Sequence, residues 1–85
     1  MLKIRDDVDL KELEKFGYEL EEWDNYYRKH EVKYQVQINI YDREILVFKM
    51  RENSEWGDYI GYTGEEEKIR PYISDLIKAN LVVKE

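Results

Sequence analysis

The fold is decided by the stretch Tyr34-Gln35-Val36-Gln37-Ile38-Asn39-Ile40-Tyr41-Asp42-Arg43-Glu44-Ile45-Leu46-Val47-Phe48-Lys49-Met50. Its first half alternates strictly between polar and apolar residues, which is typical of a strand with one buried and one solvated face. Its second half is apolar on both sides of the alternation. The stretch therefore predicts a central β-hairpin with its turn at Asp42-Arg43-Glu44.

The length of this turn decides which side chains share the core face. A three-residue loop places Val36 opposite Met50, whereas a loop one residue shorter or longer leaves Val36 opposite Lys49. We favour the three-residue loop because it gathers six apolar residues on one face. In that register Ile45 and Val47 lie on the second face, which then needs cover of its own. No Asn-Gly or Asp-Gly dipeptide is present to fix the turn.

Composition bounds the class of protein. The 85 residues predict a single domain, residues 1–85, and the lack of cysteine fits a reducing cytoplasm. The formal net charge of -6 argues against direct binding of nucleic acid or of an anionic membrane, because both require clustered Lys and Arg. We expect no membrane span, since no apolar run reaches ~18 residues, and we find no signal-peptide pattern.

Two capping patterns predict helices on either side of the hairpin. Asp9 and Glu12 have capping-box spacing, and Gly17 is placed to end that short N-terminal helix. Thr63 and Glu66 repeat the pattern near the other end of the chain.

The C-terminal helix carries the clearest amphipathic stripe, formed by Ile69, Tyr72, Ile73, Leu76 and Ile77. Pro71 interrupts it, so either the helix starts near Arg70 or a short turn over residues 65–69 is kinked onto it. Asn80 suits the left-handed position that ends a helix. Residues 81–83 then indicate a last short strand, and residues 1–5 a short edge strand.

Together these patterns predict an α+β fold with a small antiparallel sheet of three to four strands. The sheet is a β-meander around the hairpin of residues 34–50, with a short N-terminal helix and a C-terminal amphipathic helix packed on one face. Residues 18–23, with Tyr18 and Leu20 inward, and residues 26–29 supply its other strands. The structure of residues 51–64 stays open between loop, lid and strand.

Both ends of the chain carry these caps and stripes in the segments Leu2-Lys3-Ile4-Arg5-Asp6-Asp7-Val8-Asp9-Leu10-Lys11-Glu12-Leu13-Glu14-Lys15-Phe16-Gly17-Tyr18 and Ile73-Ser74-Asp75-Leu76-Ile77-Lys78-Ala79-Asn80-Leu81-Val82. These segments, roughly a third of the chain, resemble small proteins of unknown function from phages and prophages of Gram-positive bacteria. The resemblance implies a bacterial cytoplasmic setting and offers no catalytic residue to carry over.

No residue pattern predicts catalysis. His30 is the single histidine and has no cysteine or second histidine with which to hold zinc. Ser54 and Ser74 have no histidine at a suggestive spacing, and neither an EF-hand loop nor a glycine-rich phosphate loop occurs. We therefore expect a non-enzymatic protein without catalytic residues, cofactor or metal.

An acidic patch is formed by Glu19, Glu21, Glu22 and Asp24, with no Lys or Arg among residues 18–25. One interpretation is a solvated strand face. The other is a surface that binds a partner by mimicking nucleic acid. One strand supplies half the charge density of duplex DNA, so mimicry requires a second acidic row, for which residues 65–67 are the candidate.

A second candidate surface consists of Trp56, Tyr59 and Tyr62, which recur three apart among glycines. Exposed aromatics on a loop are natural interface anchors. The alternative is that this segment is a further strand or a lid packed on the second sheet face. Trp23, Tyr26 and Tyr27 leave the same choice open.

These observations favour a non-enzymatic protein-binding module of phage or prophage type, a monomer or weak homodimer in the bacterial cytoplasm. Its expected partner is a host or phage protein, and inhibition of a nucleic-acid-binding enzyme is the most concrete version. One alternative is a structural protein that self-associates through the edge strand of residues 81–83. Another is a small-molecule or nucleotide binder whose aromatics stack on a base.

Overall fold

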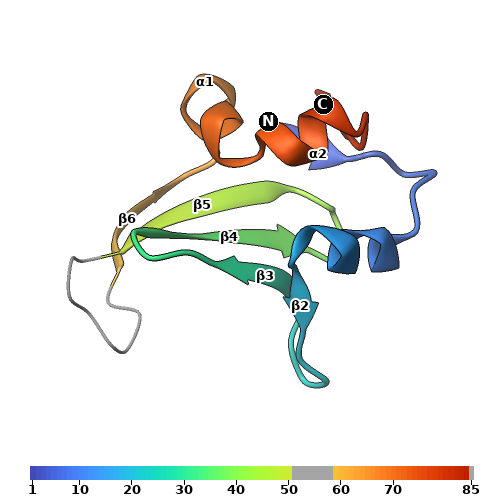
Figure 1. Cartoon of the computed structure of the whole chain (residues 1–85), viewed down its shortest axis with the longest axis horizontal. Helices are drawn as coiled ribbons and strands as arrows, with labels where there is room; N and C mark the ends of the chain where they lie inside the picture. The colour runs from blue at the N-terminus through green and yellow to red at the C-terminus, as the bar shows by residue number, and fades with distance from the viewer. Residues whose placement is uncertain (51–58, 85) are drawn as a thin grey trace.

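The computed structural model describes residues 1–50 and 59–84 and shows the predicted α+β class (Figure 1). The elements in chain order are β1 (Leu2–Ile4), η1 (Leu10–Phe16), β2 (Glu19–Leu20), β3 (Tyr26–His30), β4 (Tyr34–Asn39), β5 (Ile45–Met50), β6 (Tyr59–Thr63), α1 (Glu66–Ile69), η2 (Arg70–Tyr72), α2 (Ser74–Lys78) and β7 (Val82–Lys84), where η marks a 3-10 helix.

The main sheet is an antiparallel meander in the order β2-β3-β4-β5-β6. It has one strand more than the three to four expected, because residues 59–63 of the segment left open form β6. A second sheet pairs β1 with β7, and β1 also bridges to the start of β5 through Lys3 and Glu44. The two ends of the described chain therefore meet beside the central hairpin (Figure 1).

The hairpin forms as predicted, but the favoured register is wrong. Val36 lies opposite Val47 and Ile38 opposite Ile45, so these four residues share one fully buried face. Phe48 lies opposite Gln35 on the second face.

The register follows from the turn chemistry around Asn39. The side-chain Oδ1 of Asn39 accepts hydrogen bonds from the N–H groups of Tyr41 (2.7 Å) and Asp42 (3.2 Å), which curls the chain immediately after β4. Arg43 closes the loop in the left-handed conformation (φ 64) and donates its N–H to the Asn39 carbonyl (3.0 Å). Ile40 is consequently part of the turn and not of the strand. Each residue of β4 therefore pairs with a residue of β5 three positions earlier than predicted.

One hydrophobic core lies against the face that carries Val36 and Ile38. Figure 1 shows α1, α2 and both chain ends together on one side of the molecule, above β5. Apolar residues of β1, η1, α1 and α2 join those of the sheet in a single buried cluster: Leu2, Ile4, Leu13, Tyr18, Tyr27, Val36, Ile38, Ile45, Val47, Ile69, Ile73 and Leu76.

The helix ends show which local signals hold. Asp9 caps η1 by accepting the N–H of Lys11 (3.0 Å), and Gly17 ends η1 with φ 90, as predicted. Asn80 takes the left-handed conformation (φ 61) after α2. The prediction that Thr63 caps a helix is wrong, because Thr63 ends β6 and α1 begins only after Glu65.

Pro71 divides the expected C-terminal helix. The chain forms α1, then the 3-10 helix η2 with Pro71 in its first positions, then α2. This is the second of the two predicted arrangements, a short helical turn kinked onto the helix proper. Within the described ranges, no helix is long and apolar enough to cross a membrane.

Candidate functional site

The turn between β2 and β3 projects from the body of the protein (Figure 1). β2 has only two residues, and its pairing with β3 ends where Leu20 meets Tyr27. Leu20 is 40% exposed, so its predicted inward position is wrong, because this short edge strand lies beyond the cover of the helices. Trp23, at the turn, is 83% exposed. We call residues 19–25 the acidic turn.

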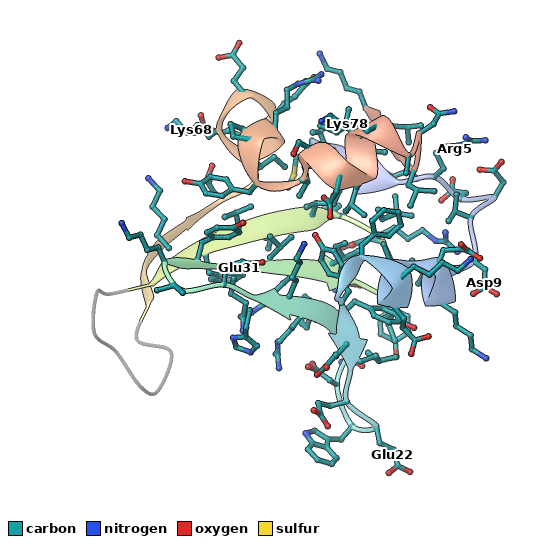
Figure 2. The ribbon with its side chains drawn as sticks, in the orientation of Figure 1. Arg5, Asp9, Glu22, Glu31, Lys68 and Lys78 are labelled. Carbon is teal, nitrogen blue, oxygen red and sulfur yellow. The ribbon has the colours of Figure 1, made fainter. Side chains whose placement is uncertain are left out.

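Three carboxylates of the acidic turn are free to meet a partner. Glu19, Glu21 and Glu22 are all exposed. Among the described residues, none of these three side chains forms an ion pair or hydrogen bond. Figure 2 shows Glu22 at the tip of the turn, pointing away from the sheet. The acidic turn therefore presents three carboxylates that form no ion pair, next to Trp23 in the sequence.

Asp24, the fourth acid of the predicted patch, faces inward. Its side chain is only 10% exposed, and its Oδ2 lies 2.6 Å from Nη1 of Arg28. Its Oδ1 accepts the N–H of Asn25 (2.8 Å). Because one oxygen accepts a backbone hydrogen bond and the other lies in an ion pair with Arg28, Asp24 stabilises the turn and is not placed to bind a partner directly.

A hollow of about 160 Å³ opens beside the turn on the second sheet face and is lined by Glu19, Glu21, Asp24, Arg28 and His30. Small-molecule sites in proteins usually occupy roughly 300–1,000 Å³. The hollow is therefore small for a nucleotide or a drug-sized ligand. Within the described ranges, no group of three or more His, Cys, Asp or Glu residues is arranged to hold a metal ion.

His30 belongs to a polar chain on the second sheet face. The side chain of Gln37 donates to Oε1 of Gln35 (2.6 Å), and Nε2 of Gln35 lies 2.8 Å from Nε2 of His30. Gln35 and Gln37 are both buried. The histidine therefore takes part in a polar network with these two glutamines.

A second exposed aromatic lies on the neighbouring turn. Tyr41, between β4 and β5, is 77% exposed. The two turns are joined by a hydrogen bond from the Ile40 N–H to the Asn25 carbonyl (2.9 Å). Val32 is 91% exposed but lies on the β3–β4 turn at the opposite end of the strands, so it offers a matched control.

The other predicted candidates lie elsewhere. Trp56 is outside the described residues. Tyr59 and Tyr62 belong to β6, and their side chains lie outside the described part. Residues 65–67 follow β6, at the sheet edge opposite to β2, so the structure does not place a second acidic row beside the acidic turn.

The acids that follow β6 are also partly neutralised. Glu66 forms ion pairs with Arg70 and with Lys84. The hydrogen bond from Arg70 lowers the pKa of Glu66 below its ordinary value. Glu65 pairs with Lys68 (3.3 Å).

Tyr18 is the most deeply buried titratable group of the described core, with 1% exposure. Its hydroxyl has no hydrogen-bond partner among the described residues, and burial raises the pKa of Tyr18 above its ordinary value. Lys29 lies over the Tyr18 ring (5.7 Å) and pairs with Asp75 (3.3 Å). The Tyr18 hydroxyl has no access to solvent, so we assign it no chemical role.

Comparison with protein-family models, with curated proteins and with solved structures finds no match to this chain. The signal for the exposed anchor was nevertheless present in the sequence. Asp24 and Asn25 form a turn signal directly after Trp23, which places a large aromatic residue in a turn.

Proposed function

We propose that the protein is a non-enzymatic protein-binding module and that the acidic turn is its binding surface. The single observation that supports this most is the 83% exposure of Trp23 on a projecting turn. Burial of a tryptophan side chain covers roughly 150–250 Å², and tryptophan is enriched among the residues that dominate binding energy at interfaces. An anchor held away from the core can enter a pocket of a partner without disturbing the fold.

The charges around Trp23 define the kind of partner. Glu19, Glu21 and Glu22 form no ion pair among the described residues, since the neighbouring Arg28 pairs with Asp24, and the whole chain carries a net charge of -6. Complementary potentials accelerate association and exclude partners of like charge. The partner we propose is a protein with a basic surface around an apolar pocket. Nucleic-acid-binding proteins carry such surfaces, so inhibition of one of them, in a bacterial host, is the specific form of the proposal.

The geometry favours an aromatic anchor over close mimicry of a duplex. Duplex mimicry would need two acidic rows, and residues 65–67 lie at the far edge of the sheet. Binding through one apolar anchor with an acidic rim needs only the acidic turn. Tyr41 is a second exposed ring, on the adjoining turn, which a backbone hydrogen bond joins to the acidic turn.

The proposal is tested by affinity capture from a nuclease-treated bacterial lysate. The parent protein is compared with Trp23→Ala and with Val32→Ala, which removes an equally exposed apolar side chain at the opposite end of the strands. We expect one prominent protein to be retained by the parent and by Val32→Ala, and to be lost with Trp23→Ala.

The charge contribution is tested with the same partner once it is purified. The double variant Glu21→Gln/Glu22→Gln should slow association and weaken its dependence on salt, because rim charges act mainly on the association rate. Equal capture by the parent and by Trp23→Ala would contradict the proposed surface.

A further inference from the structure

Within the described part of the chain, β6 is an edge strand of the main sheet. It pairs with β5, and it has no other paired strand within residues 1–50 and 59–84. Its sequence, Tyr59-Ile60-Gly61-Tyr62-Thr63, contains no charged residue and no proline. Natural sheets usually protect a long edge with charged residues or proline because its unpaired backbone groups can pair with another chain.

The other open edges carry such protection. β2 has only two residues, one of which is Glu19. β7 has three residues and ends with Lys84. Of the sheet edges in the described part of the chain, β6 therefore combines the greatest length with the absence of charge.

The direction of the backbone groups on β5 can be derived from one hydrogen bond. The N–H of Asn39 donates to the carbonyl of Glu44 (3.1 Å), so the backbone of Glu44 faces β4. Successive residues in an antiparallel sheet point their backbone groups alternately to the two neighbouring strands. Val47 and Lys49 lie three and five residues after Glu44, so their backbone groups face β6.

The same alternation continues across to β6. Val47 pairs with Thr63 and Lys49 with Gly61, so the backbone groups of Thr63 and Gly61 face β5. Tyr62 lies between them, and its N–H and C=O point outward from the edge. This regular part of β6 lies beyond the bulge at Lys49 and Met50.

Gly61 is not required by the fold itself. Its φ is not positive, and a Cβ atom placed on it would meet no described residue within 4 Å. Glycine weakens the interior of a strand, and it often marks a place where another backbone approaches closely. An exposed glycine in the middle of an uncharged edge strand is consistent with such an approach.

We propose that the β6 edge binds an extended segment of another protein by β-strand addition. An edge strand offers a row of backbone donors and acceptors that another extended backbone can pair with, so the ligand class is an extended peptide segment. This site lies on the edge of the sheet opposite to the acidic turn, so it is a second and separate interaction surface.

The charges at the end of β6 define the segment that fits. The exposed acids Glu65 and Glu67 follow the strand after Gly64; Glu65 pairs with Lys68, whereas Glu67 forms no ion pair among the described residues. A second copy of this chain would bring the same acids, and another net charge of -6, to the edge. A segment with uncharged residues opposite β6 and Lys or Arg beside them fits better.

The probe is the synthetic peptide Lys-Thr-Val-Thr-Val-Thr-Lys, and the matched control peptide has Glu in place of both Lys. Each peptide is titrated into the isotope-labelled protein, and amide chemical shifts and hydrogen exchange are followed by NMR. We expect the Lys peptide to shift the amides of residues 59–63 and to slow exchange at the Tyr62 N–H. The Glu peptide should bind at least about tenfold more weakly, because like charges oppose each other.

Protein variants separate this site from the acidic turn. Gly61→Lys places a charge on the edge and should weaken binding of the Lys peptide at least about tenfold, as Lys does on natural edge strands. Gly61→Ala should weaken binding less than Gly61→Lys does, because it adds a methyl group but no charge, and Trp23→Ala should bind the peptide like the parent. An absence of shifts in β6 at millimolar peptide would overturn the inference, as would loss of binding with Trp23→Ala. A β6-mediated dimer in light scattering, abolished by Gly61→Lys, would show that the occupant is a second copy.

Discussion

Tyr18→Phe tests the structure of the core most sharply, because it removes one oxygen and little else. Tyr18 is 1% exposed, and its hydroxyl finds no partner among the described residues. A buried hydroxyl without a hydrogen bond costs about 1–3 kcal/mol of desolvation. The phenylalanine ring retains its packing and its contact with Lys29. We therefore expect Tyr18→Phe to raise the free energy of unfolding at neutral pH by about 1 kcal/mol.

The same variant gives a signed prediction at alkaline pH. Burial, followed by the nearby Asp75, raises the pKa of Tyr18 in the folded protein above its ordinary value of 10.0. Below pH 10 the hydroxyl is protonated in both states and contributes no pH dependence. Above pH 10 the unfolded chain ionises first. The free energy of unfolding of the parent should then fall by about 1.4 kcal/mol per pH unit relative to that of Tyr18→Phe.

The measurement is urea unfolding of the parent, Tyr18→Phe and Tyr41→Phe from pH 7 to pH 11. Tyr41 is 77% exposed, so Tyr41→Phe is the control for removing a tyrosine hydroxyl outside the core. In thermal unfolding, a gain of 1 kcal/mol should raise Tm by about 4–8 °C. If Tyr18→Phe lowers stability at pH 7 by more than about 1 kcal/mol, the hydroxyl is hydrogen-bonded and the reasoning is refuted.

Further predictions concern local structure and register, each checked by the change in unfolding free energy in urea. Gly17→Ala should lower the free energy of unfolding by about 1 kcal/mol or more, because φ is +90 at Gly17. Gly61→Ala should leave it unchanged or raise it by up to about 1 kcal/mol. Equal effects of the two variants would contradict the assigned conformations. Arg43→Gly keeps the left-handed turn but removes two hydrogen bonds to backbone carbonyls of the N-terminal segment, at 2.6 and 2.7 Å, and should cost about 1–3 kcal/mol; a neutral result would show that these bonds are absent in solution. Ile45 is fully buried, so Ile45→Ala should lower the free energy of unfolding by about 2–5 kcal/mol, and Leu46→Ala should lower it clearly less. A larger effect of Leu46→Ala would support the register with a three-residue loop.

Local signals in the sequence predicted much of the fold. Asp9, Gly17 and Asn80 occupy the cap positions expected of them, because capping depends on a few neighbouring residues. The α+β class followed from the strand alternation and the amphipathic stripe. Thr63 shows the limit of such signals, because pairing with β5 extends the strand through this residue and delays the helix.

The hairpin register could not be predicted, because both faces of β5 are apolar. Either face could have joined the core by pattern alone. The choice is made by the side chain of Asn39, which curls the chain one residue before the predicted strand end, and by the left-handed Arg43. Neither residue belongs to an Asn-Gly or Asp-Gly turn, so the usual sequence signal was missing.

The candidate site was predicted in part. The acidity of residues 19–22 was visible in the sequence, but the inward position of Asp24 depends on its pairing with Arg28 four residues later. The exposure of Trp23 and Leu20 depends on how early β2 ends, which is a property of the sheet edge and not of the local pattern.

We propose that Trp23 anchors a protein partner. The decisive measurement is the Kd of the purified captured partner for the parent, Trp23→Ala and Val32→Ala, at low and high salt. We predict that Trp23→Ala weakens binding by about 2 kcal/mol or more, roughly thirtyfold, at both salt concentrations, because the lost contact is apolar. Val32→Ala should leave the Kd unchanged. Equal Kd values for the parent and Trp23→Ala would contradict the claim.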